Sequence, residues 1–242
     1  MLKDNPFFFS MPDKDSVRTM FNEISGRYDF LNHLLSFGVD RYWRRRLVKE
    51  MLRSGPEHVL DIATGTADLA IALRKKAKVR VTGVDIAWNM VQIGNRKIRE
   101  SGFAADISLL VGDAEHLEFH DSTFDAAMVA FGVRNFENLG KGLSEMKRVL
   151  KQNGKILILE FSHPHAFPLR QLYAMYSRFG IPFIGRILSL NPTAYRYLPE
   201  TVAAFPAGNA FLQIMQDTGL VNCRVISLSG GIASIYSGTK PE

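Results

Sequence analysis

Short apolar runs alternate with helical patterns through the middle of the chain, and this alternation limits the folds that the chain can adopt. The runs are rich in β-branched or aromatic residues and span 59–62, 79–84, 107–111, 124–131 and 156–161. Helical patterns lie between them at 67–77, 88–101 and 138–151. Parallel strands need crossover connections, and helical crossovers cover both faces of a sheet. The alternation therefore predicts an α/β fold with a doubly wound, mostly parallel sheet.

The two ends of the chain depart from this pattern. Apolar residues recur at helical spacing from Ser16 to Leu31, with Ser16 as the expected N-cap, and a second helix is expected from Asp40. Residues 163–218 indicate a helical insert, rich in aromatics and interrupted by prolines. The last two runs, 221–228 and 232–237, are joined through Gly230-Gly231 and predict an antiparallel hairpin that completes a seven-stranded sheet.

A single domain is expected over residues 1–242, because this length and 46% hydrophobic content suffice for one core. Its expected parts are an N-terminal helical cap (1–55), a cofactor-binding core (56–162), the helical substrate insert (163–218) and the terminal hairpin (219–242).

Composition excludes several kinds of protein. A net charge of +6 from 30 basic and 24 acidic residues is too weak to imply nucleic acid as a partner. The one cysteine, Cys223, cannot form an internal disulfide and is expected to be a packed thiol. His163 and His165 lack a positioned carboxylate, so no metal is expected. Pro6, Pro12 and charged residues surround the apolar run at 7–9, and no run suits a signal peptide or a membrane span, so a cytoplasmic location is expected.

Acidic residues end or follow three successive predicted strands. Asp61 opens the small-residue loop that contains Gly65, and Asp85 ends the next strand 24 residues later. Gly112-Asp113-Ala114 follows the third strand. The loop lacks the G-x-G-x-x-G of a dinucleotide site, which argues against a nicotinamide dehydrogenase. An acidic loop suits a nucleoside cofactor that carries positive charge instead of phosphate. The alternative is that these acids are only helix caps or turn residues.

Several motifs closely resemble those of the ubiquinone/menaquinone biosynthesis C-methyltransferases, which are class I, Rossmann-like, S-adenosylmethionine-dependent enzymes. They cover nearly the whole chain, from Val17 to Gly238, and are Tyr28-Asp-Phe-Leu-Asn32, Ser36-Phe-Gly38, Arg41-Tyr-Trp-Arg44, Phe131-Gly-Val-Arg-Asn135, Arg148-Val-Leu-Lys-Gln-Asn-Gly154 and Tyr195-Arg-Tyr-Leu-Pro-Glu-Thr201. Two positions depart from the resemblance: Ala67 stands where many relatives have glycine, and Ala130 where some have serine.

The resemblance implies methyl transfer from S-adenosylmethionine to a ring carbon of a demethylated isoprenoid quinol, most often demethylmenaquinol. A ubiquinone precursor or another lipophilic small molecule is the alternative substrate. By position, the expected cofactor contacts are Thr66, Asp85, Asp113 and Ala114, with Asp61 and Gly65 shaping the loop.

Three residues are candidates for the chemistry at the quinol ring. Arg134 is expected to stabilise the developing phenolate or orient a water, and Asn135 to fix the direction of Arg134. Tyr28 is a candidate hydrogen-bond partner for the quinol. The alternatives are an ordinary ion pair for Arg134 and an ordinary core aromatic for Tyr28. Arginine is a poor base, so the proton is expected to leave through water.

Two further features bear on a lipid substrate. Aromatics of the insert are expected to line a tunnel for a prenyl tail, although such spacing is also typical of plain core. Basic residues at 41–53 (Arg41, Arg44, Arg45, Arg46, Lys49 and Arg53) suggest peripheral contact with the inner face of the cytoplasmic membrane, or else a solvated helix face. The sequence leaves a homo-oligomer open.

Two rival functions keep the same cofactor domain. An RNA or DNA methyltransferase would be favoured by an Asn/Asp-Pro-Pro-aromatic motif or a catalytic cysteine after the fourth strand, and residues 131–135 have neither. A non-catalytic scaffold would not need intact Asp61, Gly65, Asp85 and Asp113.

Overall fold

The structure is a computed structural model that describes residues 13–164, 166–181, 183 and 192–242. Of residues 192–196 only the helix to which they belong is described. The apolar run at 7–9 and His165, both considered above, lie outside the described residues.

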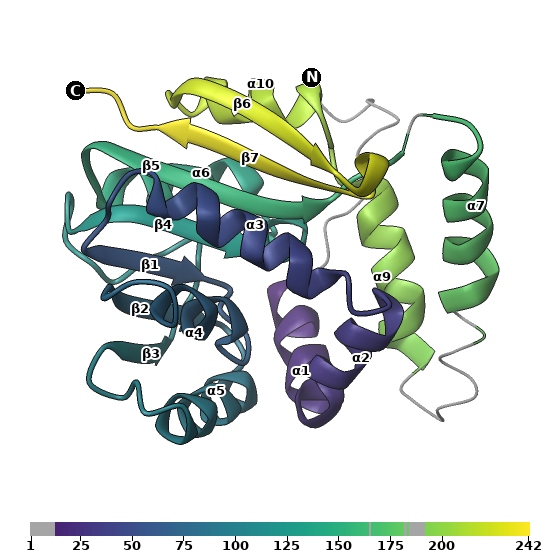
Figure 1. The fold of residues 1–242 in the computed structure, drawn as a ribbon, viewed down its shortest axis with the longest axis horizontal. Helices are drawn as coiled ribbons and strands as arrows, with labels where there is room; N and C mark the ends of the chain where they lie inside the picture. Colours follow the sequence, from purple (N-terminus) through teal and green to yellow (C-terminus); the bar gives the residue numbers. More distant parts are fainter. Residues whose placement is uncertain (1–12, 165, 182, 184–191) are drawn as a thin grey trace.

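One seven-stranded sheet forms the centre of the molecule, in the order β3-β2-β1-β4-β5-β7-β6 (Figure 1). Five strands run parallel to one another: β1 (His58–Ile62), β2 (Arg80–Asp85), β3 (Ile107–Val111), β4 (Phe124–Ala130) and β5 (Leu150–Phe161). The hairpin of β6 (Val221–Leu228) and β7 (Ala233–Thr239) adds antiparallel to β5 through β7. The predicted fold class and the terminal hairpin are confirmed.

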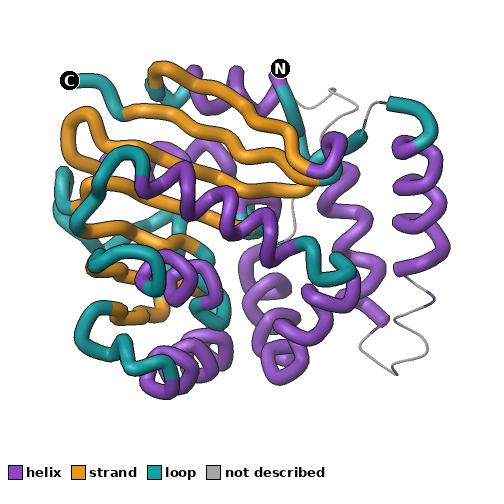
Figure 2. The backbone as a smooth tube through the Cα atoms, viewed as in Figure 1, coloured by secondary structure: helices purple, strands orange, loops and turns teal. Residues whose placement is uncertain are grey.

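Helices cover both faces of this sheet, as the crossover argument requires (Figure 2). One face packs against α3 (Asp40–Leu52), α4 (Asp68–Arg74) and α5 (Trp88–Glu100), through buried residues such as Leu47, Leu73 and Ile98. The other face packs against α6 (Leu139–Val149) and α10 (Asn209–Asp217), through Met146 and Phe211. These two apolar layers hold the carboxyl ends of the parallel strands in fixed positions.

The N-terminal helix expected from Ser16 to Leu31 is wrong in its extent. The chain forms α1 (Lys14–Ile24), a 3₁₀ turn (Ser25–Arg27) and α2 (Tyr28–Leu35). The break contains Gly26, a poor helix former. The N-cap is Asp13 instead of Ser16, because the Asp13 carboxylate accepts hydrogen bonds from the backbone amides of Asp15 and Ser16.

The boundary between α6 and β5 also differs from the expectation. The helix ends at Val149, and β5 begins at Leu150, well before the predicted start at 156. Leu150 pairs with Phe124 across an irregular register with β4. The spacing of apolar residues cannot predict where the helix gives way to the strand, because the strand residue that pairs with Leu150 lies 26 residues earlier in the sequence.

The insert between β5 and β6 contains α7 (Leu169–Met175), which continues into a π-helical turn (Tyr176–Gly180), and α9 (Pro192–Ala204). Pro199 was expected to interrupt the insert. It lies inside α9, and the helix continues through it. Figure 1 shows α1, α2 and α9 beyond the arrowheads of β1 and β4, with α7 outside α9. Within the described residues, no helix is long and apolar enough to cross a membrane.

Candidate functional site

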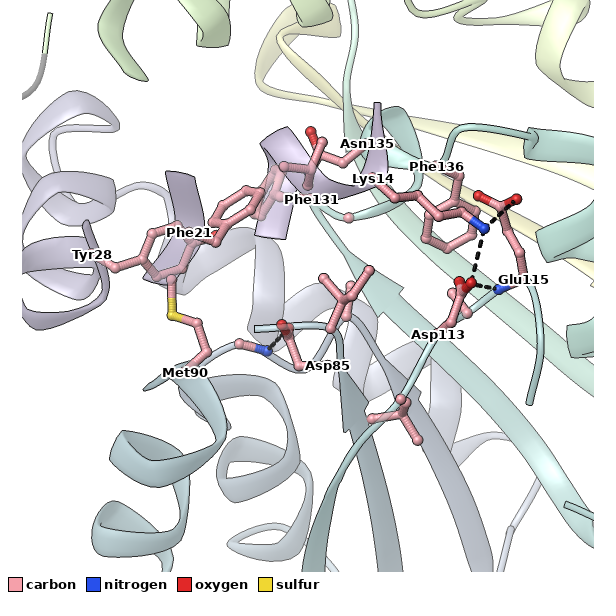
Figure 3. Close-up of a pocket in the computed structure, with 18 residues that line it drawn as sticks. Lys14, Phe21, Tyr28, Asp85, Met90, Asp113, Glu115, Phe131, Asn135 and Phe136 are labelled. Atoms are coloured by element: carbon pink, nitrogen blue, oxygen red, sulfur yellow. Dashed lines mark hydrogen bonds and ion pairs between the residues drawn. The ribbon is translucent and has the colours of Figure 1, made fainter. Parts of the chain in front are cut away.

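A cavity lies at the carboxyl ends of β1 to β4, where the strand order reverses. Ligands of doubly wound sheets bind at this topological switch point. Gly65, Asp85 and Asp113 reach the cavity from the strand ends, and Lys14 and Tyr28 reach it from the N-terminal helices (Figure 3). The cavity is therefore closed on one side by the parallel strands and on the other by α1 and α2.

The loop after β1 takes left-handed backbone angles at alternate positions, with φ of +50° at Ala63, +57° at Gly65 and +67° at Ala67. Such angles suit glycine and cost other residues energy. A Cβ at Gly65 would make an ordinary contact with the Tyr28 ring, 3.7 Å from its Cε1, so the backbone angle and not space favours glycine here. The compact loop lets its backbone face the cavity, as predicted from its small residues.

Asp85 ties this loop to the end of β2. Its carboxylate accepts hydrogen bonds from the backbone amides of Gly65 (2.8 Å) and Ala87 (2.9 Å). Burial raises the pKa of Asp85, although the two amide hydrogen bonds act in the opposite direction. A carboxylate has about four acceptor positions, so this one can still receive the hydroxyls of a ribose in the cavity.

Asp113 and Ala114 line the far end of the same cavity. The Asp113 carboxylate accepts hydrogen bonds from the Lys14 ammonium (2.8 Å) and from the Glu115 backbone amide (2.8 Å). Lys14 also pairs with the buried Glu115 at 3.0 Å. Partial burial acts to raise the pKa of Asp113, but the hydrogen bond from Lys14 and the amide hold it below its usual value.

Asp61 and Thr66 lie behind the loop and do not line the cavity. Asp61 is fully buried and accepts a hydrogen bond from the Thr64 hydroxyl at 2.7 Å. Burial raises the pKa of Asp61 to about 7, and the negative Asp85 adds to this effect. The Thr66 hydroxyl donates to Asp29, which also pairs with Lys97. Both positions support the loop, and direct contact with a cofactor stays a prediction.

A second cavity lies between α2, α3, α7 and α9. Its lining is mainly aliphatic and aromatic and includes Trp43, Phe161, Tyr173 and Ile181. Phe131, directly after β4, lines both this cavity and the first one. A third, smaller cavity shares Tyr28 with the first and Arg134 with the second. The first and second cavities thus adjoin around these residues.

Arg134 is buried between the cavities and paired with Glu160. The Arg134 Nη1 lies 2.8 Å from a Glu160 carboxylate oxygen and also donates to the Phe131 carbonyl at 2.5 Å. Glu160 is fully buried at the end of β5. The Arg134 Nε is buried and has no hydrogen-bond partner in the structure. Arg134 therefore forms the ion pair that was the alternative to a role in the chemistry, and the residue also lines the apolar cavity.

The sequence analysis missed Glu160, although a signal for it was present. The carboxylate follows a run of apolar strand residues, and a buried carboxylate needs a partner. The basic residue after the neighbouring strand is Arg134. That Arg134 is the partner of Glu160 could have been inferred from the neighbouring positions of β4 and β5, but not from the spacing of residues along either strand.

Asn135 and Tyr28 lie on opposite sides of this junction. Asn135 lines the first cavity, and its side-chain oxygen accepts a hydrogen bond from the Tyr197 hydroxyl of α9 at 2.9 Å. The ring of Tyr28 contacts Phe21 edge-on, with centroids 5.9 Å apart. Burial raises the pKa of Tyr28, while the positive Arg134 acts to lower it. Asn135 thus connects the segment after β4 to the insert. Its expected role in orienting Arg134 stays a prediction.

Two tyrosines of the insert face Arg134. Burial raises the pKa values of Tyr173 and Tyr197 to about 12, and Arg134 and Glu160 act on both. Both phenols therefore stay protonated as donors. The prediction that insert aromatics line a cavity is supported for Tyr173 and Tyr176.

The basic residues at 41–53 do not form one free surface. Arg44 pairs with the buried Asp40 and places its guanidinium 5.7 Å from the centre of the Phe131 ring. Arg53 pairs with Glu50 at 2.6 Å. The remaining members are exposed: Arg41, Arg45, Arg46 and Lys49. The inclusion of Arg44 in a lipid-facing patch is therefore wrong, because its side chain is only 11% exposed and pairs with the buried Asp40.

Two further observations concern metal-ligating side chains and the cysteine. In the part of the chain that the structure describes, no group of three or more histidine, cysteine, aspartate or glutamate side chains is placed to hold a metal ion. Cys223 is half-buried on β6, and its thiol lies 3.6 Å from the Leu220 carbonyl. Burial raises the pKa of this thiol, which favours the unreactive protonated form.

The doubly wound sheet, the antiparallel hairpin and the acid-lined cavity at the switch point are those of Rossmann-like, S-adenosylmethionine-dependent methyltransferases. Residues 10–240 match the model of the ubiE/COQ5 methyltransferase family. The chain belongs to this family, and the predicted resemblance is confirmed.

Relatives and a solved structure agree with this assignment. The chain is 40% identical to the demethylmenaquinone methyltransferase of Bacteroides fragilis, with 98% of each chain covered. It is 43% identical to the ubiquinone/menaquinone biosynthesis C-methyltransferase UbiE of Geotalea uraniireducens, covering 96% of this chain and 100% of the relative. The crystal structure of the [4+2]-cyclase SpnF is similar with a TM-score of 0.68, 17% identity and coverage of 95% and 97%. At that identity the likeness concerns the fold alone, which can support unrelated reactions.

Proposed function

We propose that this chain transfers a methyl group from S-adenosylmethionine to a ring carbon of a demethylated isoprenoid quinol, with demethylmenaquinol as the favoured substrate. The observation that carries this proposal is the pairing of two unlike cavities. An acid-lined cavity at the strand ends adjoins a larger apolar one, and Phe131 lines both. A charged methyl donor and a lipophilic acceptor can be held against each other in this arrangement.

The first cavity fits the methyl donor. Asp85 would receive the ribose hydroxyls, Asp113 with Ala114 would hold the adenine, and the backbone around Gly65 would face the amino acid part. Three nearby carboxylates, Asp61, Asp85 and Asp113, favour a ligand with positive charge. When bound, the donor supplies an electrophilic methyl group on a sulfonium.

The second cavity suits an isoprenoid tail. Each buried methylene-sized group contributes about 0.8 kcal/mol, so a tail gains much free energy in a lining such as Trp43, Phe161 and Ile181. Polar side chains also line this cavity, and Arg134 and Tyr173 are among them. Arg134 and Tyr173 are therefore placed to fix the one polar part of the substrate, its ring oxygens.

Arg134 is the residue we assign to the developing phenolate. A ring carbon becomes nucleophilic when the neighbouring hydroxyl loses its proton, and a cation beside the oxygen stabilises the anion. The free Nε of Arg134 is a donor without a partner, and Glu160 holds the guanidinium in place. The proton leaves to water, because arginine stays protonated. Asn135 and Tyr197 position the insert against this group.

The names of the relatives bear on the quinol. The Bacteroides fragilis relative is named for demethylmenaquinone, and the Geotalea uraniireducens relative for both quinone pathways. Demethylmenaquinol is favoured on this basis, and a ubiquinone precursor or another lipophilic molecule is the alternative. We further propose that no metal and no nucleic acid take part.

The test is to incubate the purified chain with methyl-labelled S-adenosylmethionine and, in parallel, demethylmenaquinol, a demethylated ubiquinone precursor and RNA. Label is expected in the menaquinol product first. Label in RNA alone would refute the quinol assignment, and no transfer to any acceptor would favour the scaffold reading.

A further inference from the structure

Half of the large hydrophobic side chains exposed in the described residues lie around one part of the insert. They are Phe37, Phe167, Leu172, Met175, Phe179 and Phe183. Exposed apolar residues that gather in one region, unlike scattered ones, mark an interaction site. We call these six residues the insert face.

The insert face follows from how α7 and its π-helical turn pack. Tyr173 and Tyr176 point toward the second cavity, and the Tyr176 hydroxyl donates to the Leu35 carbonyl at 2.8 Å. Met175 and Phe179 are four positions apart, share a different side of this helical segment, and are 57% and 63% exposed. Figure 1 shows α7 outside α9, away from the sheet.

The insert face is continuous with the second cavity. Phe37 and Leu172 line this cavity and are also 75% and 53% exposed, so they form its rim. The ring of Phe37 lies 5.5 Å from that of Tyr176, which brings the turn after α2 beside α7. A tail entering the cavity between these residues would pass directly from the exposed apolar side chains to the buried ones.

Five of the six insert-face residues lie in a stretch of sequence whose charged residues are all basic. The sequence contains no aspartate or glutamate from residue 161 to 199, but it contains Arg170, Arg178, Arg186 and Arg196. Arg170 and Arg178 are exposed on α7 and its turn, and Arg178 lies 5.6 Å from the Phe179 ring centre. Apolar side chains beside arginine, without acids, complement the interface of an anionic bilayer.

We propose that the insert face is the surface that docks this protein on a bilayer containing anionic lipid, with the rim of the second cavity at the lipid surface. This inference rests on the proposed function for the identity of the substrate, a quinol dissolved in that bilayer. The surface differs from the basic residues at 41–53, of which Arg44 is turned inward.

The test is sedimentation of the full chain with vesicles, in the absence of quinol and methyl donor. Vesicles of phosphatidylcholine with phosphatidylglycerol are expected to bind the protein, and phosphatidylcholine alone much less. The double variant Met175→Ser/Phe179→Ser should bind roughly tenfold more weakly, because it removes two apolar anchors. Arg178→Gln should weaken binding several-fold and reduce its dependence on salt.

Matched controls change exposed residues elsewhere. Leu110→Ser on the edge strand β3 and Arg96→Gln on α5 should bind vesicles as the unaltered chain does. Three results would overturn the proposal: no vesicle binding by the unaltered chain, equal binding by the Met175/Phe179 variant, or a loss that only Arg45→Gln/Lys49→Gln produces.

A second measurement separates this proposal from the proposed function. Neither Met175 nor Phe179 lines a cavity, so methylation of a short-tailed, water-soluble quinol should be unchanged in their variant. Methylation of a long-tailed quinol in vesicles should fall roughly tenfold, in step with binding. Absence of any quinol methylation would refute the proposed function, and vesicle binding would still decide the docking surface. Equal loss with both quinols would contradict the docking role.

Discussion

Asp61 is the residue whose charge the surroundings oppose most clearly. Its carboxylate is buried beneath the β1 loop, accepts a hydrogen bond from Thr64 and has a pKa of about 7. The value for the unfolded chain is about 3.8. Between these two values the folded state binds the proton more tightly, so the stability contribution is lost as pH rises from about 4 to about 7.

Asp61→Asn should remove this part of the pH dependence. The amide keeps an oxygen for the Thr64 hydroxyl and carries no charge at any pH. The free energy of unfolding, measured with urea from pH 4 to pH 8, should fall less in the variant than in the unaltered chain, by about 2–4 kcal/mol over that range. Parallel curves for the two proteins would contradict the raised pKa.

The buried ion pair of Arg134 and Glu160 should contribute to the free energy of unfolding. Glu160→Gln leaves the buried guanidinium without its counter-charge, which should lower the free energy of unfolding by about 3 kcal/mol. Arg134→Met leaves the buried Glu160 carboxylate without its counter-charge and should lower the free energy of unfolding by a similar amount. The double variant should recover part of the loss, because it buries neither an unpaired cation nor an unpaired anion.

Activity separates the two roles of this pair. Turnover should be low in both single variants and should not recover in the double variant, since the double variant still lacks the guanidinium assigned to the phenolate. Binding of S-adenosylhomocysteine should change little in all three. Recovered turnover in the double variant would show that the ion pair has a structural role alone.

At the scale of elements, α1 covers one side of the cavity at the strand ends. Lys14, Val17 and Phe21 line the cavity, and Lys14 connects the helix to Asp113 and Glu115. At its other end α1 is attached to α5, where Asn89 donates to the Asn22 carbonyl at 3.1 Å. We expect these contacts of α1 to slow the exchange of a ligand bound in the cavity.

Lys14→Met should therefore speed exchange of the cofactor. The variant keeps an apolar stem against the cavity and loses the ion pairs, so the dissociation rate of S-adenosylhomocysteine, measured by stopped flow, should rise several-fold. Arg18→Met on the same helix is the control, because Arg18 is exposed and pairs only with Asp15 in its own helix. Equal rates in Lys14→Met and the control would show that α1 does not limit exchange.

At the scale of the whole molecule, the cofactor cavity joins the N-terminal helices to four strand ends. A ligand there contacts both parts, so binding should stabilise the entire fold. At about 100 times the dissociation constant, a ligand adds about 2.7 kcal/mol. For a chain of this length that corresponds to roughly 5–10 °C in Tm.

Thermal unfolding with and without S-adenosylhomocysteine should show this shift. Asp85→Ala should lose most of it at the same ligand concentration, because it removes the carboxylate that receives the ribose and joins the loop to β2. Leu110→Ala, on the edge strand, should keep the full shift. A full shift in Asp85→Ala would contradict the role given to that carboxylate.

The order of elements and the family could be read from the sequence alone. Strand and helix periodicities are local, so the alternating runs predicted the parallel sheet, and Gly230-Gly231 predicted the hairpin. Asp85 and Asp113 could be placed at the cavity because parallel strands end at one edge. The predicted N-cap of the first helix was wrong for a local reason: the Asp13 carboxylate, not the Ser16 hydroxyl, accepts hydrogen bonds from the backbone amides that begin the helix.

Only the tertiary structure decided which side chains meet. Lys14 reaches Asp113 across 99 residues, Asp29 receives the Thr66 hydroxyl across 37, and Glu160 holds Arg134 across 26. The same holds for the insert face, which depends on which side of α7 packs on the cavity. These contacts arise from packing between elements distant in sequence, which no local periodicity encodes, and they determine how the site is closed, oriented and entered.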